Sequence, residues 1–242
     1  MLAPVQGQLL GQNTSDEPTV KQKILLIVVT SNRGLCGAFN ANIIKTAIKR
    51  MNETYSLELN AGQLELFCIG KKSSDFFQKR GYPMKQFDNQ IIDSLTFTRA
   101  AEIAQSLIQE FTNGTYKKIE VVYNYFKNAA TQQVVVEDFL PLIIPQKTDN
   151  IVADENKYLL EPSKEHILDV ILPKSLKIQF YKILLDSLAS EHGARMTAMN
   201  KATDNASELL KELKLSYNKA RQAAITTEII EIVSGAEVLK GA

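Results

Sequence analysis

Continuous apolar runs alternate with helix-spaced apolar positions over the first part of the chain. Residues 24–30 (ILLIVVT) form an unbroken run rich in β-branched side chains, which is typical of a strand buried on both faces. Residues 41–55 follow with apolar side chains at helical spacing. The alternation continues, with strands predicted at 63–69 and 118–126 and helices at 73–80 and 96–111. This order predicts an α/β domain built on a mostly parallel sheet with helices on both faces.

The ends of this domain are marked by changes in composition. Residues 132–140 (QQVVVEDFL) predict one more strand at an edge of the sheet, because Pro141 and Pro145 break the pattern directly afterwards. Residues 1–21 lack periodicity and are interpreted as a flexible lead-in. We therefore assign 22–145 to the α/β domain and the mostly polar 146–172 to a linker, with at most a short strand at 157–160.

The last part of the chain predicts one long helix. Between Lys174 and Ser234 there is no proline and a single glycine, Gly193, while helix-forming residues dominate. Residues 173–242 would form a rod of roughly 100 Å, longer than the core of one domain of this size. Its apolar positions recur near every 3.5 residues, as in one helix of a coiled coil. From Arg221 to Leu239 apolar residues cover most of the circumference, so we expect this end to enter a socket in a partner protein.

Composition and charge narrow the class of protein. The formal net charge is +1, with both signs spread along the chain, so nucleic acid and anionic membrane surfaces are not expected partners. Cys36 and Cys68 stand in apolar surroundings and are interpreted as reduced core thiols. Neither a signal peptide nor a membrane-spanning run is present, so we expect an intracellular protein whose membrane association comes through a partner.

Motifs for catalysis or ligand binding are weak. Residues 31–37 (SNRGLCG) lie between the first strand and the first helix, where parallel sheets often hold a phosphate, but the G-x-G-x-x-G spacing is absent. Residues 70–73 (GKKS) lack the order of a P-loop. The two histidines, His166 and His192, fall in the linker and on the long helix, outside any known catalytic or metal-binding pattern. We therefore predict no catalytic residue, no cofactor and no metal.

Five segments closely resemble the gamma subunit of rotary ATP synthases, over roughly residues 24–240. The first follows the first predicted strand, and the others lie on the long helix. They are 30–40 (TSNRGLCGAFN), 193–199 (GARMTAM), 202–206 (ATDNA), 217–226 (YNKARQAAIT) and 231–236 (EIVSGA). The resemblance implies a Rossmann-like sheet domain beside a shaft of two antiparallel helices, of which the long C-terminal helix is one half.

The resemblance also implies a function. Such a subunit is a non-catalytic rotor in the central stalk, which couples proton flow to ATP synthesis by turning inside the catalytic hexamer. Its implied partners are the alpha and beta subunits, the epsilon subunit and the membrane rotor ring. These would hold it at the cytoplasmic face of the inner membrane. The R-Q-x-x-I-T part of the motif implies that Arg221, Gln222 and Thr226 form a catch with the catalytic subunits.

One departure and one alternative accompany this interpretation. The family begins with a long basic helix that contains methionine, and nothing before Gln22 resembles it, so we expect the chain to lack that half of the shaft. The alternative function is a small nucleotide-binding α/β enzyme with an oligomerisation helix. Thermal stabilisation by millimolar nucleotide would favour the enzyme, because a ligand that binds the native state raises its stability.

Overall fold

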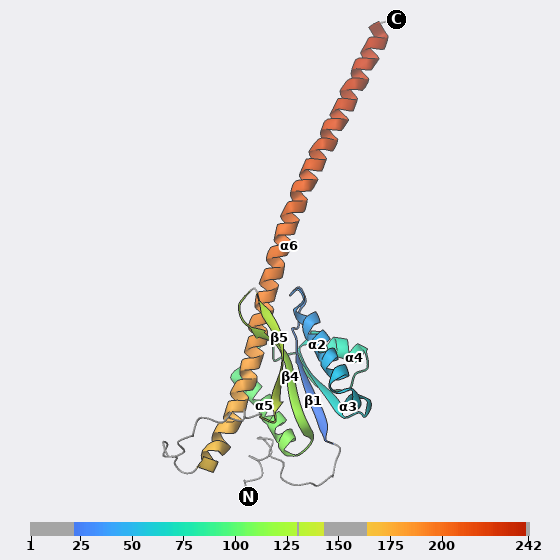
Figure 1. The fold of residues 1–242 in the computed structure, drawn as a ribbon. Coiled ribbons are helices and arrows are strands. Elements are labelled where there is room, and N and C mark those ends of the chain that lie inside the picture. Colours follow the sequence, from blue (N-terminus) through green and yellow to red (C-terminus); the bar gives the residue numbers. More distant parts are fainter. Residues whose placement is uncertain (1–21, 130, 143–163, 241–242) are drawn as a thin grey trace, which may run out of the picture. The chain divides into compact units, whose positions relative to one another are not determined.

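The computed structural model describes residues 22–129, 131–142 and 164–240, with side chains from 169 to 236 in the last range. Figure 1 shows the elements and their order. They are β1 (Lys23–Val29), α2 (Phe39–Glu53), α3 (Ser56–Asn60), β2 (Leu64–Ile69), α4 (Lys71–Lys79), β3 (Met84–Asp88), α5 (Phe97–Thr112), β4 (Tyr116–Phe126), β5 (Gln132–Leu140) and α6 (Lys164–Lys240). The strand predicted at 157–160 lies outside the described residues.

The strands form one sheet in the order β3-β2-β1-β4-β5. β1 pairs in parallel with β2 and β4, and β2 pairs in parallel with β3. β5 is antiparallel to β4 and lies at an edge of the sheet. The predictions of a mostly parallel sheet and of an edge strand at 132–140 are confirmed.

Two short elements, β3 and α3, were not predicted. β3 has the sequence MKQFD, in which apolar and polar residues do not alternate, and Phe87 is 56% exposed. It pairs with β2 on one side only and forms the other edge of the sheet. An edge strand with so little buried surface leaves no hydrophobic pattern in the sequence.

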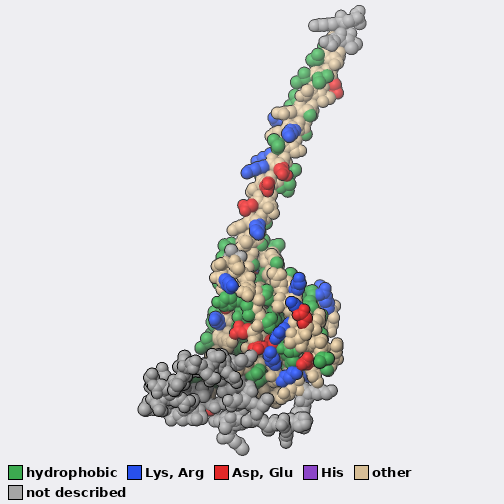
Figure 2. All heavy atoms as spheres, viewed as in Figure 1, with side chains coloured by type: hydrophobic (Ala, Val, Ile, Leu, Met, Phe, Trp, Pro, Cys, Tyr) green, Lys and Arg blue, Asp and Glu red, His purple; other side chains and the backbone are tan. Residues whose placement is uncertain are grey.

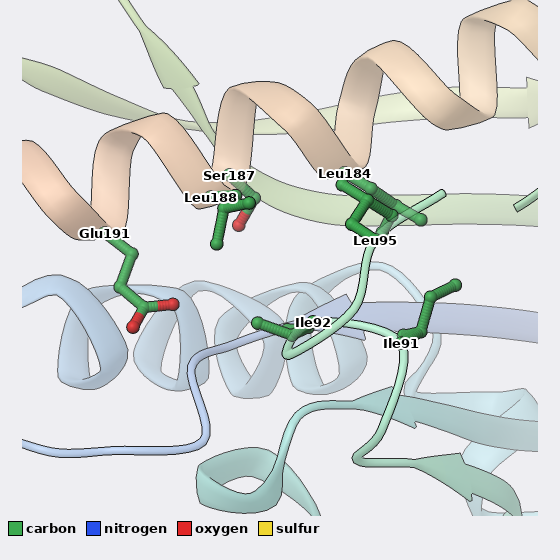
Figure 3. Close-up of a pocket in the computed structure, with 7 residues that line it drawn as sticks. All are labelled: Ile91, Ile92, Leu95, Leu184, Ser187, Leu188 and Glu191. Carbon is green, nitrogen blue, oxygen red and sulfur yellow. The ribbon is translucent and has the colours of Figure 1, made fainter. Parts of the chain in front are cut away.

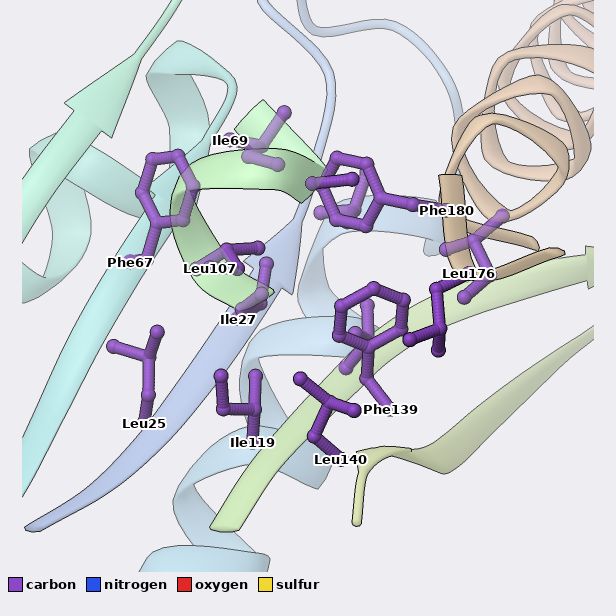
Figure 4. Packing of buried hydrophobic residues seen from close by; sticks show 14 of the residues in the cluster. Leu25, Ile27, Phe67, Ile69, Leu107, Ile119, Phe139, Leu140, Leu176 and Phe180 are labelled. Atoms are coloured by element: carbon purple, nitrogen blue, oxygen red, sulfur yellow. The ribbon is translucent and has the colours of Figure 1, made fainter. Parts of the chain in front are cut away.

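Each face of the sheet carries its own hydrophobic core, because side chains alternate along β1. Leu25 and Ile27 point into the core under α5 and the first part of α6. Leu26 and Val28 point into the core under α2 and α4. Figure 4 shows the first core, in which the rings of Phe139 and Phe180 lie 5.6 Å apart, joining β5 to α6. The unbroken apolar run of β1 is thus explained by burial on both faces.

The long helix is confirmed, but its expected start near Pro173 is wrong. α6 runs from Lys164 to Lys240, 77 residues, and contains Pro173. A proline inside a helix removes one hydrogen bond and costs about 3 kcal/mol. Leu172 and Leu176 pack on the core on either side of it, and their burial offsets that cost.

The chain forms two compact units that divide after Thr197, within α6. The four-part division made from the sequence stays a prediction. In the described ranges, no helix combines the length and the hydropathy needed to cross a bilayer.

The hairpin between β4 and β5 approaches α6 closely at Gly193. A Cβ atom at this position would lie 3.0 Å from the carbonyl oxygen of Ala129 and 3.2 Å from its Cα. The Thr197 hydroxyl also donates to that carbonyl, at 3.4 Å. Backbone atoms of a hairpin cannot move aside as a flexible side chain can.

We therefore expect Gly193→Ala to lower the free energy of unfolding by about 1 kcal/mol, because displacing the hairpin outweighs the helix propensity gained. Thermal melts followed by circular dichroism measure this change. Gly235→Ala is the matched control, since nothing lies within 4 Å of its added methyl group. An equal stability gain in both variants would contradict the prediction.

Candidate functional site

Every residue from 199 to 236 of α6 is exposed in this chain. Exposure extends to large apolar side chains, which lie between 38% and 67% exposed. They are Met199, Leu209, Leu210, Leu213, Leu215, Tyr217, Ile225, Ile229, Ile230, Ile232 and Val233. So long an apolar surface on one helix is a surface for contact with other protein chains.

The structure brings two of the three predicted catch residues together. Gln222 and Thr226 are four residues apart and share one face of α6. The Thr226 hydroxyl donates to the Gln222 carbonyl at 2.8 Å, which leaves its oxygen as an acceptor. Arg221 lies about 100° around the helix from Gln222. Across the described residues, the side chains of Arg221 and Gln222 make no hydrogen bond or ion pair, so their polar groups remain available to a partner.

The large aliphatic side chains that follow these residues are exposed and lie on one side of α6. The large aliphatic side chains from Ile225 to Val233 share one arc of roughly 160°, at about 100° per residue. Gln222 and Thr226 lie within this arc, and Arg221 lies at its border. The site is therefore a polar pair surrounded by aliphatic side chains, with one guanidinium at its edge.

Polar groups of the loop 31–37 are hydrogen-bonded to other residues of this chain. Asn40 accepts from the Ser31 amide at 3.0 Å, and its Nδ2 donates to the Ser31 hydroxyl at 2.7 Å. The Asn32 side chain accepts from the amide of Lys71 at 3.0 Å, at the start of α4. Leu35 has a φ of 63° and is 76% exposed. These bonds fix the loop itself and explain its motif without a phosphate.

A contact between this loop and α6 was missed by sequence reasoning. Arg195 donates to the Glu191 carboxylate at 2.7 Å and to the Gly34 carbonyl at 3.4 Å. Glu191 is only 7% exposed. The signal in the sequence was the four-residue spacing of Glu191 and Arg195, which places both on one helical face.

Glu120 on β4 is the centre of the strongest electrostatic cluster described. Its carboxylate is fully buried and accepts from Arg50 at 2.7 and 3.0 Å and from Lys118 at 2.7 Å. The Tyr55 hydroxyl donates to it as well. Burial opposes ionisation, but the bonds from Arg50, Lys118 and Tyr55 outweigh it and lower the pKa of Glu120 to about 2. The cluster joins α2 to the sheet and is structural.

The cavity beside α6 is too small for a ligand. Figure 3 shows it between α6 and the residues that follow β3, with the Glu191 carboxylate at one end and with Ser187 and aliphatic side chains along the rest. Its volume is about 10 Å³, close to the space that one water needs.

Comparisons with known proteins decide the family. The family model described as ATP synthase matches residues 3–239. The ATP synthase gamma chain of Flavobacterium johnsoniae is 52% identical over 239 residues, which cover 99% of this chain and 80% of that protein. The gamma chain of Flavobacterium psychrophilum is 55% identical over 241 residues, with the same shares. The chain belongs to the ATP synthase gamma chain family.

Solved structures agree with this membership of the gamma chain family. The central stalk and c-ring structure of the Tetrahymena thermophila mitochondrial ATP synthase contains a chain that is 26% identical, with a TM-score of 0.54. The match covers 82% of this chain and 86% of that one. A chain of the Euglena gracilis mitochondrial ATP synthase reaches a TM-score of 0.64 at 20% identity, over 97% of this chain and 79% of that one. The latter likeness concerns the fold.

Membership of the gamma chain family confirms the resemblance and decides against the nucleotide-binding enzyme. It makes this chain a rotor-shaft subunit of ATP synthase that is not catalytic by itself. The match begins at residue 3, before the residue 24 expected from the motifs. The chain spans about 80% of the length of these two relatives. The roles of Arg221, Gln222 and Thr226 stay predictions.

Proposed function

We propose that this gamma chain turns inside a hexamer of alpha and beta subunits and connects it to the epsilon subunit and the membrane rotor ring. The observation that carries the proposal is the exposed apolar surface from 199 to 236. A monomer in water does not keep so many large aliphatic side chains exposed, so a ring of partner subunits is their fitting environment. The structural relative from Tetrahymena thermophila comes from an assembly of central stalk and c-ring, which supports the connection to the membrane.

The catch with the catalytic subunits is the finer part of this proposal. Arg221 presents a planar fork suited to a carboxylate, while Gln222 offers a donor and an acceptor. Each can bind a partner loop in one rotational state and release it in the next, so successive catalytic sites experience different contacts. Their aliphatic neighbours exclude water from the contact, which strengthens its hydrogen bonds. Thr226 contributes its free acceptor.

The location follows from the partners. A gamma chain bound to the membrane rotor ring is a peripheral membrane protein. We place it at the cytoplasmic face of the inner membrane, where the catalytic hexamer would stand. Fractionation of cells into membrane and soluble parts, with and without an intact rotor ring, tests this placement.

The catch is tested by Arg221→Ala combined with Gln222→Ala in the assembled synthase. A charge-assisted hydrogen bond contributes about 1.5–3 kcal/mol, which biases one rotational state about tenfold or more. We therefore expect ATP synthesis to fall about tenfold while the subunit folds and assembles normally. Synthesis and hydrolysis rates of purified complexes measure the effect.

The matched control is Thr227→Ala combined with Glu231→Ala, two exposed positions on the opposite side of α6. This pair is expected to leave both rates within about twofold of the original, because surface changes away from a contact have small effects. Subunit stoichiometry is checked in every complex. Equal rates for the original and the Arg221 and Gln222 variant, in normally assembled complexes, would remove the catch assignment.

A further inference from the structure

A groove of about 500 Å³ lies between α2 and α4, on the side of these helices that does not face the sheet. The buried stripe of α2 contains Ile43 and Ala47, which pack on the core. A second stripe beside it, with Ile44 and Ile48 one turn apart, lines the groove. Phe76 of α4 lines the opposite wall.

The apolar walls of the groove are held in place before any partner binds. Ile44, Ile48 and Phe76 are partly buried and rest on the core cluster beneath α2 and α4. The Phe76 ring packs edge-on against Phe77 with 5.3 Å between centroids. The Arg80 guanidinium lies 3.9 Å from the Phe76 ring centroid. Binding here would require little ordering of side chains, which favours affinity.

The rim of the groove carries two positively charged side chains, Lys45 and Lys72. Lys45 and Lys72 line it and are exposed, and neither has a carboxylate within ion-pair distance among the described residues. Four other lysines in the described part of the same unit are paired across elements, as Lys23 is with Glu65 at 2.6 Å. Figure 2 shows Lys and Arg side chains gathered at this part of the α/β domain. An apolar floor between unpaired cations is complementary to an apolar stripe bordered by carboxylates.

We propose that the groove between α2 and α4 binds an acidic amphipathic helix of a partner protein. Apolar side chains of that helix, spaced three and four residues apart, would pack on Ile44, Ile48 and Phe76. Its flanking carboxylates would pair with Lys45 and Lys72. A helix would lie between the wall formed by α2 and the wall formed by α4, and the rim charges select an acidic helix over a basic one. This surface is separate from the Arg221 site and does not depend on it.

The test uses the full chain and two designed helical peptides of about four turns. Both carry the same leucine stripe, a fluorophore and a photoreactive group, and they differ only in bordering the stripe with Glu or with Lys. The Glu peptide is expected to bind saturably and to crosslink to α2 and α4. Lys45→Glu combined with Lys72→Glu should weaken its binding about tenfold and should make the Lys peptide the tighter ligand.

Lys127→Glu combined with Lys174→Glu is the matched control, since both residues are exposed in the same unit as the groove and neither of them lines it. It should leave binding at the groove unchanged. Circular dichroism confirms that all variants are folded. Equal binding of the two peptides, crosslinks confined to residues 199–236, or unchanged binding after reversal of Lys45 and Lys72 would each overturn the proposal. A dimer in sedimentation that only the Lys45 and Lys72 reversal dissociates would also overturn it, by identifying a second copy as the occupant.

Discussion

Glu120→Gln is expected to lower the free energy of unfolding by about 3–5 kcal/mol, the cost of breaking a buried ion pair by removing one partner. The amide keeps the size of the side chain, but it cannot accept from Arg50, Lys118 and Tyr55 as a carboxylate does. Those donors bond to Glu120, a residue of β4 whose carboxylate is fully buried. Urea unfolding followed by circular dichroism measures the change.

The pH dependence of this loss distinguishes an electrostatic cause from a packing defect. The folded pKa of Glu120 is about 2, below its ordinary 4.5. Its contribution, on the order of 3 kcal/mol, is therefore complete above pH 4.5 and is lost as the pH falls toward 2. The difference between the original chain and Glu120→Gln should narrow over this range. A constant difference would attribute the effect to packing.

Glu58→Gln provides the matched control. Glu58 pairs with Lys117 at 3.1 Å, near the surface. Exposed pairs of this kind contribute about 0–1 kcal/mol. A loss of several kcal/mol in this variant would contradict the assignment of the large effect to burial.

The second large effect is expected for Gly70→Ala, which should cost more than about 4 kcal/mol or prevent folding. Gly70 joins β2 to α4 with a φ of 98°. A Cβ atom built there lies 2.0 Å from the carbonyl oxygen of Thr30 and 2.7 Å from its carbonyl carbon. Relief of this clash requires separating the ends of β1 and β2. It would also break the bond from the Ser73 amide to the Thr30 hydroxyl, 2.9 Å long, that starts α4.

Gly81→Ala separates this clash from backbone strain alone. Gly81 also has a positive φ, 69°, but nothing lies within 4 Å of an added methyl group. The left-handed conformation costs a non-glycine residue roughly 1–2 kcal/mol. The free energies of unfolding of the two variants, obtained from their denaturation midpoints, should therefore differ by several kcal/mol. Similar losses of stability in the two variants would show that the backbone at Thr30 moves away from the added methyl group without a free-energy cost.

The main elements of the sheet domain were predictable because burial on both faces leaves an unmistakable run in β1. α2 and α5 were predictable from their helical period. β3 was not, since an edge strand with Phe87 exposed carries no pattern. The start of α6 was misplaced because a proline normally begins or ends a helix. Here tertiary packing around Pro173 overrides that local preference.

The candidate site was predictable only through the motif that contains Arg221, Gln222 and Thr226. Residue types alone predicted that this end of α6 enters a partner protein, but not which polar side chains contact that partner. Long-range pairs left no signal at all, as with Arg50 and Glu120, which are 70 positions apart in the chain. Such pairs depend on the fold that brings α2 and β4 together, so periodicity and spacing cannot indicate them.

The contacts that hold α6 between Ser190 and Thr197 have a mechanical consequence. Ser190 donates to the Asn124 carbonyl at 3.1 Å, and Gly193 and Thr197 meet the β4–β5 hairpin on the same side of the helix. Arg195 donates to the Gly34 carbonyl in the loop from a direction roughly 140–160° away around the helix. A helix held from two sides cannot rotate about its own axis relative to the sheet. Rotation of this segment of α6 about its own axis therefore turns the sheet with it, with no slippage between helix and strand.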